Sequence, residues 1–205
     1  MSHWFDARYF GEAFVTLLVI IDPLGTVPIF LALTRERSRP ARRRAAWQAV
    51  LVAFVVICAF AAFGQQILSY LGIGIPALQG AGGLLLLLVA LELLTDRADE
   101  PREVEDVNVA LVPLGTPLLA GPGAIVAAIV FVRRANGAGD LVGLAVAIIA
   151  VHLVLWVALR YSGVIIRVVK DSGIVLLTRI AGLLLSAIAV QLVADSVIGF
   201  AHGAG

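Results

Sequence analysis

Near its N-terminus the chain reads Asp22-Pro23-Leu24-Gly25-Thr26-Val27-Pro28, in the middle of an apolar run from about Tyr9 to Leu33. Proline removes a backbone donor and clashes with the preceding helical turn, and glycine loosens a helix further. In a bilayer the backbone groups freed by such a break cannot bond to water, so they must be buried in protein or line a cavity. A span that only anchors a protein has no use for this break.

A second break of the same kind lies farther along the chain. Gly121-Pro122-Gly123-Ala124 falls within a charge-free run from Val107 to Val132, and Pro122 follows Pro23 by 99 residues. Paired breaks in corresponding halves of a membrane protein are the best sequence indication of a transporter's binding site. The sequence therefore predicts a small transporter whose site comprises both breaks.

The composition indicates an integral membrane protein. Hydrophobic residues make up 61% of the 205 residues and charged residues 14%, whereas an ordinary soluble domain is about half apolar. Runs of about 20 apolar residues predict an all-α fold of six membrane spans with no separate soluble domain. The predicted spans are Phe10–Leu33, Ala46–Ile67, Pro76–Leu94, Val109–Val132, Leu141–Leu159 and Ile174–Ile198.

The basic residues predict the orientation of the chain. Only Arg8, Arg133 and Arg134 lie on the side of the two termini. The opposite side carries the rest of the 15: Arg35, Arg37, Arg39, Arg42, Arg43, Arg44, Arg97, Arg102, Arg160, Arg167, Lys170 and Arg179. By the positive-inside rule, that opposite side faces the cytoplasm and both termini lie outside it.

The two halves of the chain match at a constant offset of 99 residues, which indicates an internal repeat. The distinctive matches pair Pro23 with Pro122, Gly64 with Gly163, Gly74 with Gly173, Gly83 with Gly182, and Asp96 with Asp195. Each repeat has three spans, so the second copy must enter the membrane from the opposite side. We expect two inverted three-helix repeats, residues 1–94 and 109–205, joined by an acidic cytoplasmic linker over residues 95–108. Spans one and four are then broken near the midplane.

The two broken segments resemble the MarC family. The resemblance rests on the string from Asp22 to Phe30 and the string from Thr116 to Ile125, and it covers the whole chain. This family, also called the neutral amino acid transporter family, comprises inner-membrane proteins of bacteria and archaea and is grouped with the lysine exporters. Some members resemble carriers of glycine and alanine. The resemblance implies a membrane transporter of small neutral amino acids.

Asp22 is the acidic residue near the middle of span one. A bare carboxylate there costs about 2.5–3.5 kcal/mol on insertion scales, so we expect it to be protonated, paired or facing water. Gly25, Thr26 and Val27 then begin a second half-helix whose free N–H groups attract anions. Two interpretations stay open: Asp22 only caps this half-helix, or it contacts a substrate amine or a coupling ion.

The second break has no charge, because Gly121 stands where the first has Asp22. After Pro122, the backbone N–H groups of Gly123 and Ala124 could approach a carboxylate closely, so one break would hold the amine and the other the carboxylate. The alternative is that these small residues serve close helix packing. The lack of acidic residues in span four also argues against a carrier of metal ions.

Five further polar residues are candidates with two interpretations each. Thr26 and Thr116 are either hydroxyl ligands beside the breaks or bonded to their own backbone. Glu92 and Asp195 are either proton sites or solvated residues near the membrane surface. His152, in mid-span, either titrates during a proton cycle or stays neutral and bonded to a neighbour.

Other functional classes find less support in the sequence. No nucleotide-binding loop is present, so ATP is not the direct driver and no cofactor is expected. An enzyme would need a nucleophile and base or paired carboxylates within the membrane, and the interior offers only Asp22. A structural or assembly protein and an ion channel remain alternatives. The expected partners are a small solute, H⁺ or Na⁺, and the lipid bilayer, with no nucleic acid.

Overall fold

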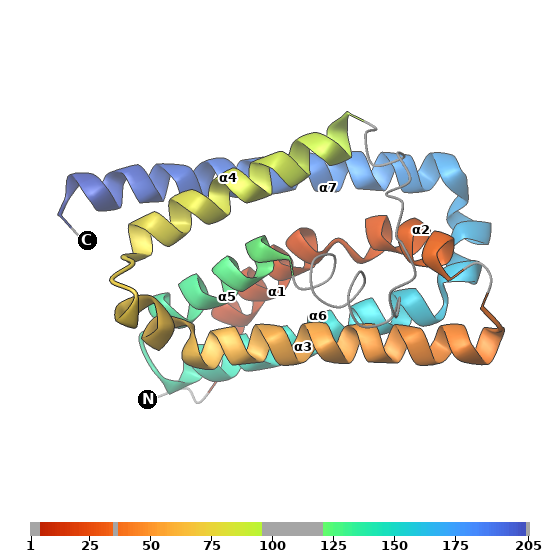
Figure 1. Cartoon of the computed structure of the whole chain (residues 1–205), viewed down its shortest axis with the longest axis horizontal. Helices are drawn as coiled ribbons and strands as arrows, with labels where there is room; N and C mark the ends of the chain where they lie inside the picture. The colour runs from red at the N-terminus through yellow and green to blue at the C-terminus, as the bar shows by residue number, and fades with distance from the viewer. Residues whose placement is uncertain (1–4, 35–36, 96–120, 204–205) are drawn as a thin grey trace.

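The computed structural model describes residues 5–34, 37–95 and 121–203, and all regular structure within these ranges is helical. The predicted all-α fold is therefore confirmed for the described part of the chain. Figure 1 shows an elongated bundle whose helices run mostly along its long axis. The helices are α1 (Ala7–Ile21), α2 (Pro23–Leu33), α3 (Arg39–Tyr70), α4 (Ile75–Leu94), α5 (Pro122–Arg134), α6 (Ala138–Arg160) and α7 (Ser162–Ala201).

Five segments among the described residues are long and apolar enough to cross a membrane. They are α1 and α2 taken together (Ala7–Leu31), α3, α4, α6, and the part of α7 from Ser172 to Ala201. The predicted fourth span is described only from Gly121 onward, where α5 supplies its second half. The chain is thus a multi-pass membrane protein.

α3 and α7 extend furthest beyond the apolar runs that predicted them. α3 begins at Arg39 rather than Ala46, because the Ser38 side chain caps it by accepting from Ala41 N at 3.4 Å and arginine is a good helix former. α7 begins at Ser162 rather than Ile174 and bends at Lys170, whose φ of 58° is left-handed. Hydropathy marks the membrane-spanning part of a helix and not its polar extension.

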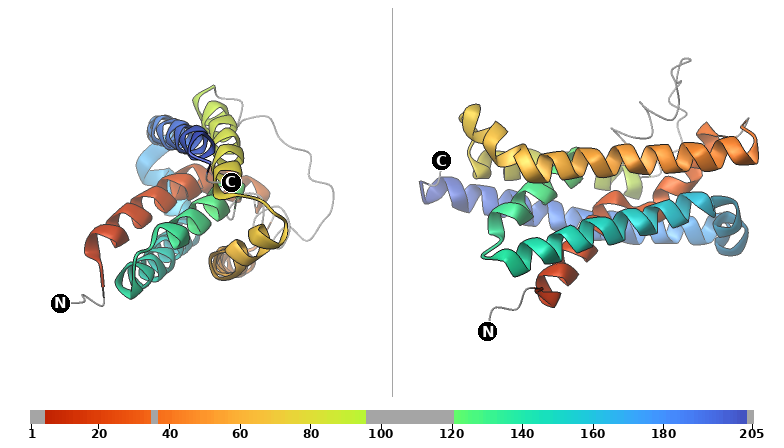
Figure 2. Two further views of the ribbon diagram at one scale, coloured as in Figure 1. Left: turned by 90° about the vertical axis from the view of Figure 1, so that its left-hand side faces the viewer. Right: turned by 90° about the horizontal axis from the view of Figure 1, so that it is seen from below.

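The helices pack in pairs around two apolar cores. α4 and α7 lie side by side and form one pair, seen end-on in Figure 2, and α3 lies against α6. α1 packs against α5 and α6. The main core includes Leu17, Ile21, Val27, Phe30, Ile57, Ala124 and Leu155, while the smaller core consists of Leu86, Ala90, Leu185, Ala189 and Leu192 between α4 and α7.

Glycines bring α5 close to α4. A Cβ built on Gly82 of α4 would lie 2.5 Å from Val126 Cγ1, and one on Gly123 of α5 would lie 2.0 Å from Leu86 Cδ2. Both distances are far below van der Waals contact, so each glycine is required by the neighbouring side chain. Small residues let membrane helices approach in this way. The α4–α5 contact thus fixes where the second half-helix begins.

Replacing Gly82 by valine is expected to destabilise the protein, because the new side chain would overlap Val126. Overpacking of this kind typically costs about 1–3 kcal/mol. The measurement is the thermal unfolding midpoint of the purified protein in detergent. Gly11→Val is the matched control, since a Cβ at Gly11 in α1 meets nothing within 4 Å. Equal midpoints for the two variants would contradict the close α4–α5 contact.

Candidate functional site

The predicted break in the first span lies at Asp22. α1 ends at Ile21 and α2 begins at Pro23, while Asp22 between them has φ 41° and ψ 73°, in the left-handed region. Asp22 N donates to Leu18 O at 3.0 Å, and Asp22 O accepts from Thr26 N at 3.0 Å. Aspartate is among the few non-glycine residues that adopt this conformation. One residue therefore closes α1 and opens α2.

The two carboxylate oxygens of Asp22 have different surroundings. Oδ1 accepts from the backbone N of Gly25 at 3.1 Å, which is an N-cap bond at the start of α2. Oδ2 is buried and has no hydrogen-bond partner in the described part of the chain. A Cβ on Gly25 would lie 2.1 Å from Oδ2, so the missing side chain of Gly25 makes room for the carboxylate. The cap thus occupies one oxygen, and the second has no hydrogen-bond partner among the residues that the structure describes.

Thr26 is buried directly beyond the break and bonds to backbone. Its hydroxyl donates to Asp22 O at 2.8 Å and lies 3.3 Å from Ile21 O. The bond to Ile21 O spans the break, because that carbonyl belongs to α1 and Thr26 to α2. The hydroxyl hydrogen is therefore already engaged in holding the two half-helices together. Only the lone pairs of Thr26 remain for the predicted ligand role.

The second break also begins a helix, but a different side chain occupies the space beside it. Gly121 is the N-cap of α5, and its carbonyl accepts from Ala124 N at 3.0 Å. Leu86 of α4 occupies the space in front of Gly123. In this structure Gly123 therefore serves close helix packing, the second of its two interpretations. The Ala124 N–H is bonded within its own helix turn. Thr116 lies outside the described residues.

The structure brings the two breaks into the same core. Ile21, immediately before the first break, and Ala124, in the first turn of α5, belong to one buried cluster, and α1 contacts α5. Figure 1 shows α2 and α5 extending from the middle of the molecule toward opposite ends. α2 begins at the buried Pro23, whereas α5 begins at the exposed Pro122 and is buried at Gly123 and Ala124. Both N-termini carry a partial positive charge.

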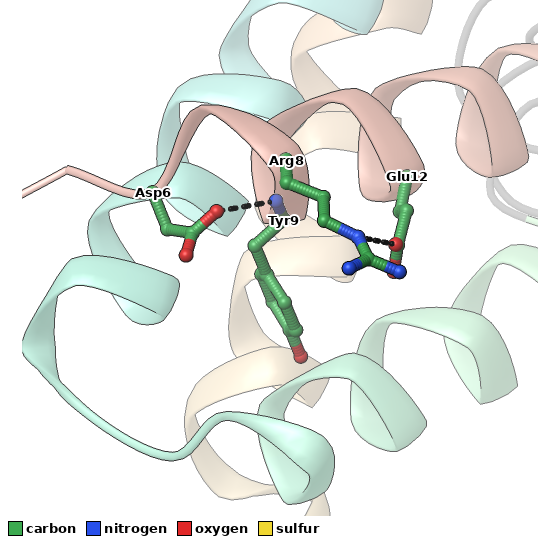
Figure 3. A network of polar contacts seen from close by, with 4 residues as sticks. All are labelled: Asp6, Arg8, Tyr9 and Glu12. Atoms are coloured by element: carbon green, nitrogen blue, oxygen red, sulfur yellow. Dashed lines mark hydrogen bonds and ion pairs between the residues drawn. The ribbon is translucent and has the colours of Figure 1, made fainter.

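A tyrosine that the sequence did not single out ties α1 to α5. Asp6 caps α1 by accepting from Tyr9 N at 2.8 Å, and the Tyr9 hydroxyl reaches α5 and donates to Phe131 O. Figure 3 shows the Tyr9 ring directed at that helix, beside the exposed Arg8–Glu12 pair. Tyrosine in a hydropathy pattern counts as apolar, and a bond to a distant backbone carbonyl leaves no sequence signal.

The three predicted proton sites belong to α4, α6 and α7 and not to the two broken segments. His152 in α6 is buried, with Nδ1 2.8 Å from Ile148 O and its ring against Phe54 of α3. Its Nε2 is buried without a hydrogen-bond partner among the described residues. Asp195 in α7 pairs with Arg134 of α5 and accepts from Gln191 Nε2 at 2.7 Å. Glu92 lies near the end of α4 and is exposed.

Comparison with known proteins gives consistent matches over nearly the full chain. The family model described as "MarC family integral membrane protein" matches residues 7–201. A UPF0056 membrane protein of Methanocaldococcus jannaschii is 36% identical over 201 residues, which cover 95% of this chain and 98% of the relative. A UPF0056 membrane protein of Aquifex aeolicus is 37% identical, covering 91% of each chain. UPF0056 membrane protein YhcE of Escherichia coli is 29% identical, covering 98% of this chain and 97% of the relative. No solved structure matches the chain.

Proposed function

Because the chain belongs to the MarC family of integral membrane proteins, we propose that it is a secondary transporter in the inner membrane of a bacterium or archaeon. It moves small neutral amino acids such as alanine or glycine, or related small solutes, by export or uptake coupled to H⁺ or Na⁺. The main support is the left-handed break at Asp22, which leaves one buried carboxylate oxygen without a hydrogen-bond partner among the described residues, inside a membrane span.

A carboxylate is not needed merely to cap α2. Asparagine or serine would accept the same bond from Gly25 N without a charge, whereas a charge in mid-membrane costs about 2.5–3.5 kcal/mol on insertion scales. The free oxygen of Asp22 supports a second role, as the acceptor of a substrate ammonium group, a proton or Na⁺. Each of these ligands offsets the burial of the negative charge. Transport would use Asp22 as its exchangeable cation site.

The helix boundaries support the two inverted repeats that such a transporter requires. α2 and α5 begin at Pro23 and Pro122, and α3 and α6 begin at Arg39 and Ala138. Both pairs differ by the 99-residue offset seen in the sequence. The halves of the chain therefore break and restart their helices at equivalent positions, and inverted repeats commonly place a transporter's site at such breaks.

Equivalent contacts between α4 and α7 support the same repeat. A Cβ on Gly83 would lie 2.8 Å from Val193 Cγ2, and one on Gly182 would lie 3.1 Å from Leu94 Cγ. The two contacts are equivalent, because the 99-residue offset takes Gly83 to Gly182 and Leu94 to Val193. In each, the glycine of one helix faces the corresponding position of the other helix. A pseudo-two-fold axis between α4 and α7 accounts for this reciprocity.

The distribution of charge supports an orientation with both termini outside the cytoplasm. Figure 1 shows the N- and C-termini at the same end of the molecule, together with the turn between α3 and α4. The end of α2, the start of α3 and the connection between α6 and α7 lie at the other end, where most arginines occur in the sequence. By the positive-inside rule the arginine-rich end faces the cytoplasm.

The experiment is solute flux in proteoliposomes made from the purified protein. We expect saturable, gradient-dependent accumulation of labelled alanine or glycine under an imposed H⁺ or Na⁺ gradient, and stimulation by unlabelled solute on the opposite side. Protein-free liposomes and liposomes with an ionophore are the controls. Flux that neither saturates nor shows counterflow would favour a channel. No flux under any gradient from folded protein would favour a structural or assembly role without transport or catalysis.

A further inference from the structure

A large cleft opens at the end of the molecule that holds both termini. Its volume is about 1020 Å³, and it lies where α3 ends, α4 begins, and α5 and α7 end. Neither Asp22 nor Gly121 lines this cleft, so it is separate from the two breaks. The polar residues that line it come from three helices and are Gln65, Gln66, Ser69, Gln79 and Arg133.

The lining favours a solute that carries a carboxylate. Arg133 contributes a positive charge, Gln65 and Gln79 contribute neutral amide donors, and none of the described residues that line the cleft is acidic. The Gln66 amide donates instead to two backbone carbonyls of its own helix. Gln79 is the most telling of these residues, because it is only 7% exposed although it belongs to the membrane helix α4. A mostly buried amide favours a hydrogen-bonding ligand over an apolar one. The Gln79 amide can donate to a carboxylate in the cleft, and arginine recognises carboxylates with two parallel bonds.

The polar residues that α3 contributes to the cleft have no polar counterparts in the second repeat. The offset of 99 residues takes Gln65, Gln66 and Ser69 to Val164, Ile165 and Val168. An unchanged duplicate would place the same polar side chains at the opposite end of the molecule. The cleft is therefore a feature of the terminus-bearing end and not a consequence of the repeated architecture.

The tight contact between α4 and α5 lies between the cleft and the start of α5. Gln79 lies one turn before Gly82 on α4, and Arg133 lies two turns after Val126 on α5. Gly82 and Val126 touch each other, so they close the space between the cleft and the start of α5. A solute held by Gln79 and Arg133 would thus rest directly above the segment that separates it from the breaks.

We propose that this cleft binds the carboxylate group of a small solute with one carboxylate, such as a neutral amino acid, through Arg133 and Gln79. This is a second binding site, separate from the breaks. Its role as the point where a transported solute enters or leaves the protein rests on the proposed function. Arg133 forms an ion pair with the carboxylate. The Gln79 amide donates an uncharged hydrogen bond that determines how deep in the cleft the solute binds. The ammonium group needs no acidic partner in this cleft and stays hydrated.

The test is calorimetric titration of the purified protein in lipid nanodiscs with alanine, propionate and ethylamine. Alanine and propionate are expected to bind, and ethylamine, which lacks the carboxylate, is not. Arg133→Gln should weaken propionate binding by at least roughly tenfold, as expected for loss of a charged hydrogen bond, and Gln79→Leu should weaken it by a smaller factor. Arg8→Gln is the matched control, because it removes one positive charge at the same end, away from the cleft.

Propionate also separates this site from the breaks. Because it has no amine, its affinity should be unchanged in Asp22→Asn. Equal binding of ethylamine and propionate, no propionate binding, or an Arg133→Gln variant with native affinity would overturn the proposal. Alanine flux with an unchanged KM in Arg133→Gln would overturn the cleft site and leave transport intact. Arg133-dependent propionate binding without flux under any gradient would support the cleft site and count against transport.

Discussion

Asp22→Asn is expected to abolish gradient-driven flux of alanine while the protein stays folded. Asparagine keeps the side-chain oxygen that accepts from Gly25 N, and it tolerates the left-handed conformation at this position. It loses the negative charge and the proton site on Oδ2. Loss of one charge-assisted contact should lower flux by at least about tenfold. The measurements are labelled-alanine uptake in proteoliposomes and the thermal unfolding midpoint in detergent.

Asp6→Asn is the matched control for this prediction. Asp6 also caps a helix, because it accepts from Tyr9 N at the start of α1, but it lies at the end of the span and not at the break. Its replacement should leave flux close to native. Native flux in Asp22→Asn would show that Asp22 is a cap alone. Failure of Asp22→Asn to fold would favour the structural interpretation of the break.

The break in the first span could be predicted because its cause is local. Pro23 lacks an N–H group, and Asp22 can adopt a left-handed conformation that few other residues tolerate. Both facts are properties of single residues, and the structure places the break at this position. The apolar runs predicted six spans, of which the described residues show five, for the same reason, since hydropathy is additive along the chain.

The contacts between distant helices could not be predicted in this way. Gly123 indicated a close approach, but only the structure shows that Leu86 of α4 fills the space in front of it. The cleft shared by Gln79 and Arg133 joins helices that are far apart in the sequence. A sequence pattern shows which residues share one face of a helix, whereas a site of this kind depends on the register between two neighbouring helices. That register is set by pairs such as Gly82 and Val126.

Gly25→Ala is expected to lower both stability and flux, because the new methyl group would take the place of the Asp22 carboxylate. A Cβ at this position lies 2.1 Å from Oδ2 and 2.9 Å from Cγ of Asp22. The carboxylate must rotate away, which breaks its bond with Gly25 N at a cost of about 1 kcal/mol, and overpacking adds roughly 1–3 kcal/mol. The measurements are the unfolding midpoint and alanine flux.

A double-mutant cycle isolates this contact from the general effect of adding a methyl group. In an Asp22→Ala background the carboxylate is absent, so Gly25→Ala should be neutral or should stabilise α2 by roughly 0.5–1 kcal/mol, the usual preference of a helix for alanine over glycine. The sign of the Gly25→Ala effect therefore reverses between the two backgrounds. Gly11→Ala, which meets nothing within 4 Å, should have the same small effect in both. An equal loss from Gly25→Ala in both backgrounds would mean that the methyl group collides with something other than Asp22, and that Gly25 is not kept small by the carboxylate beside it.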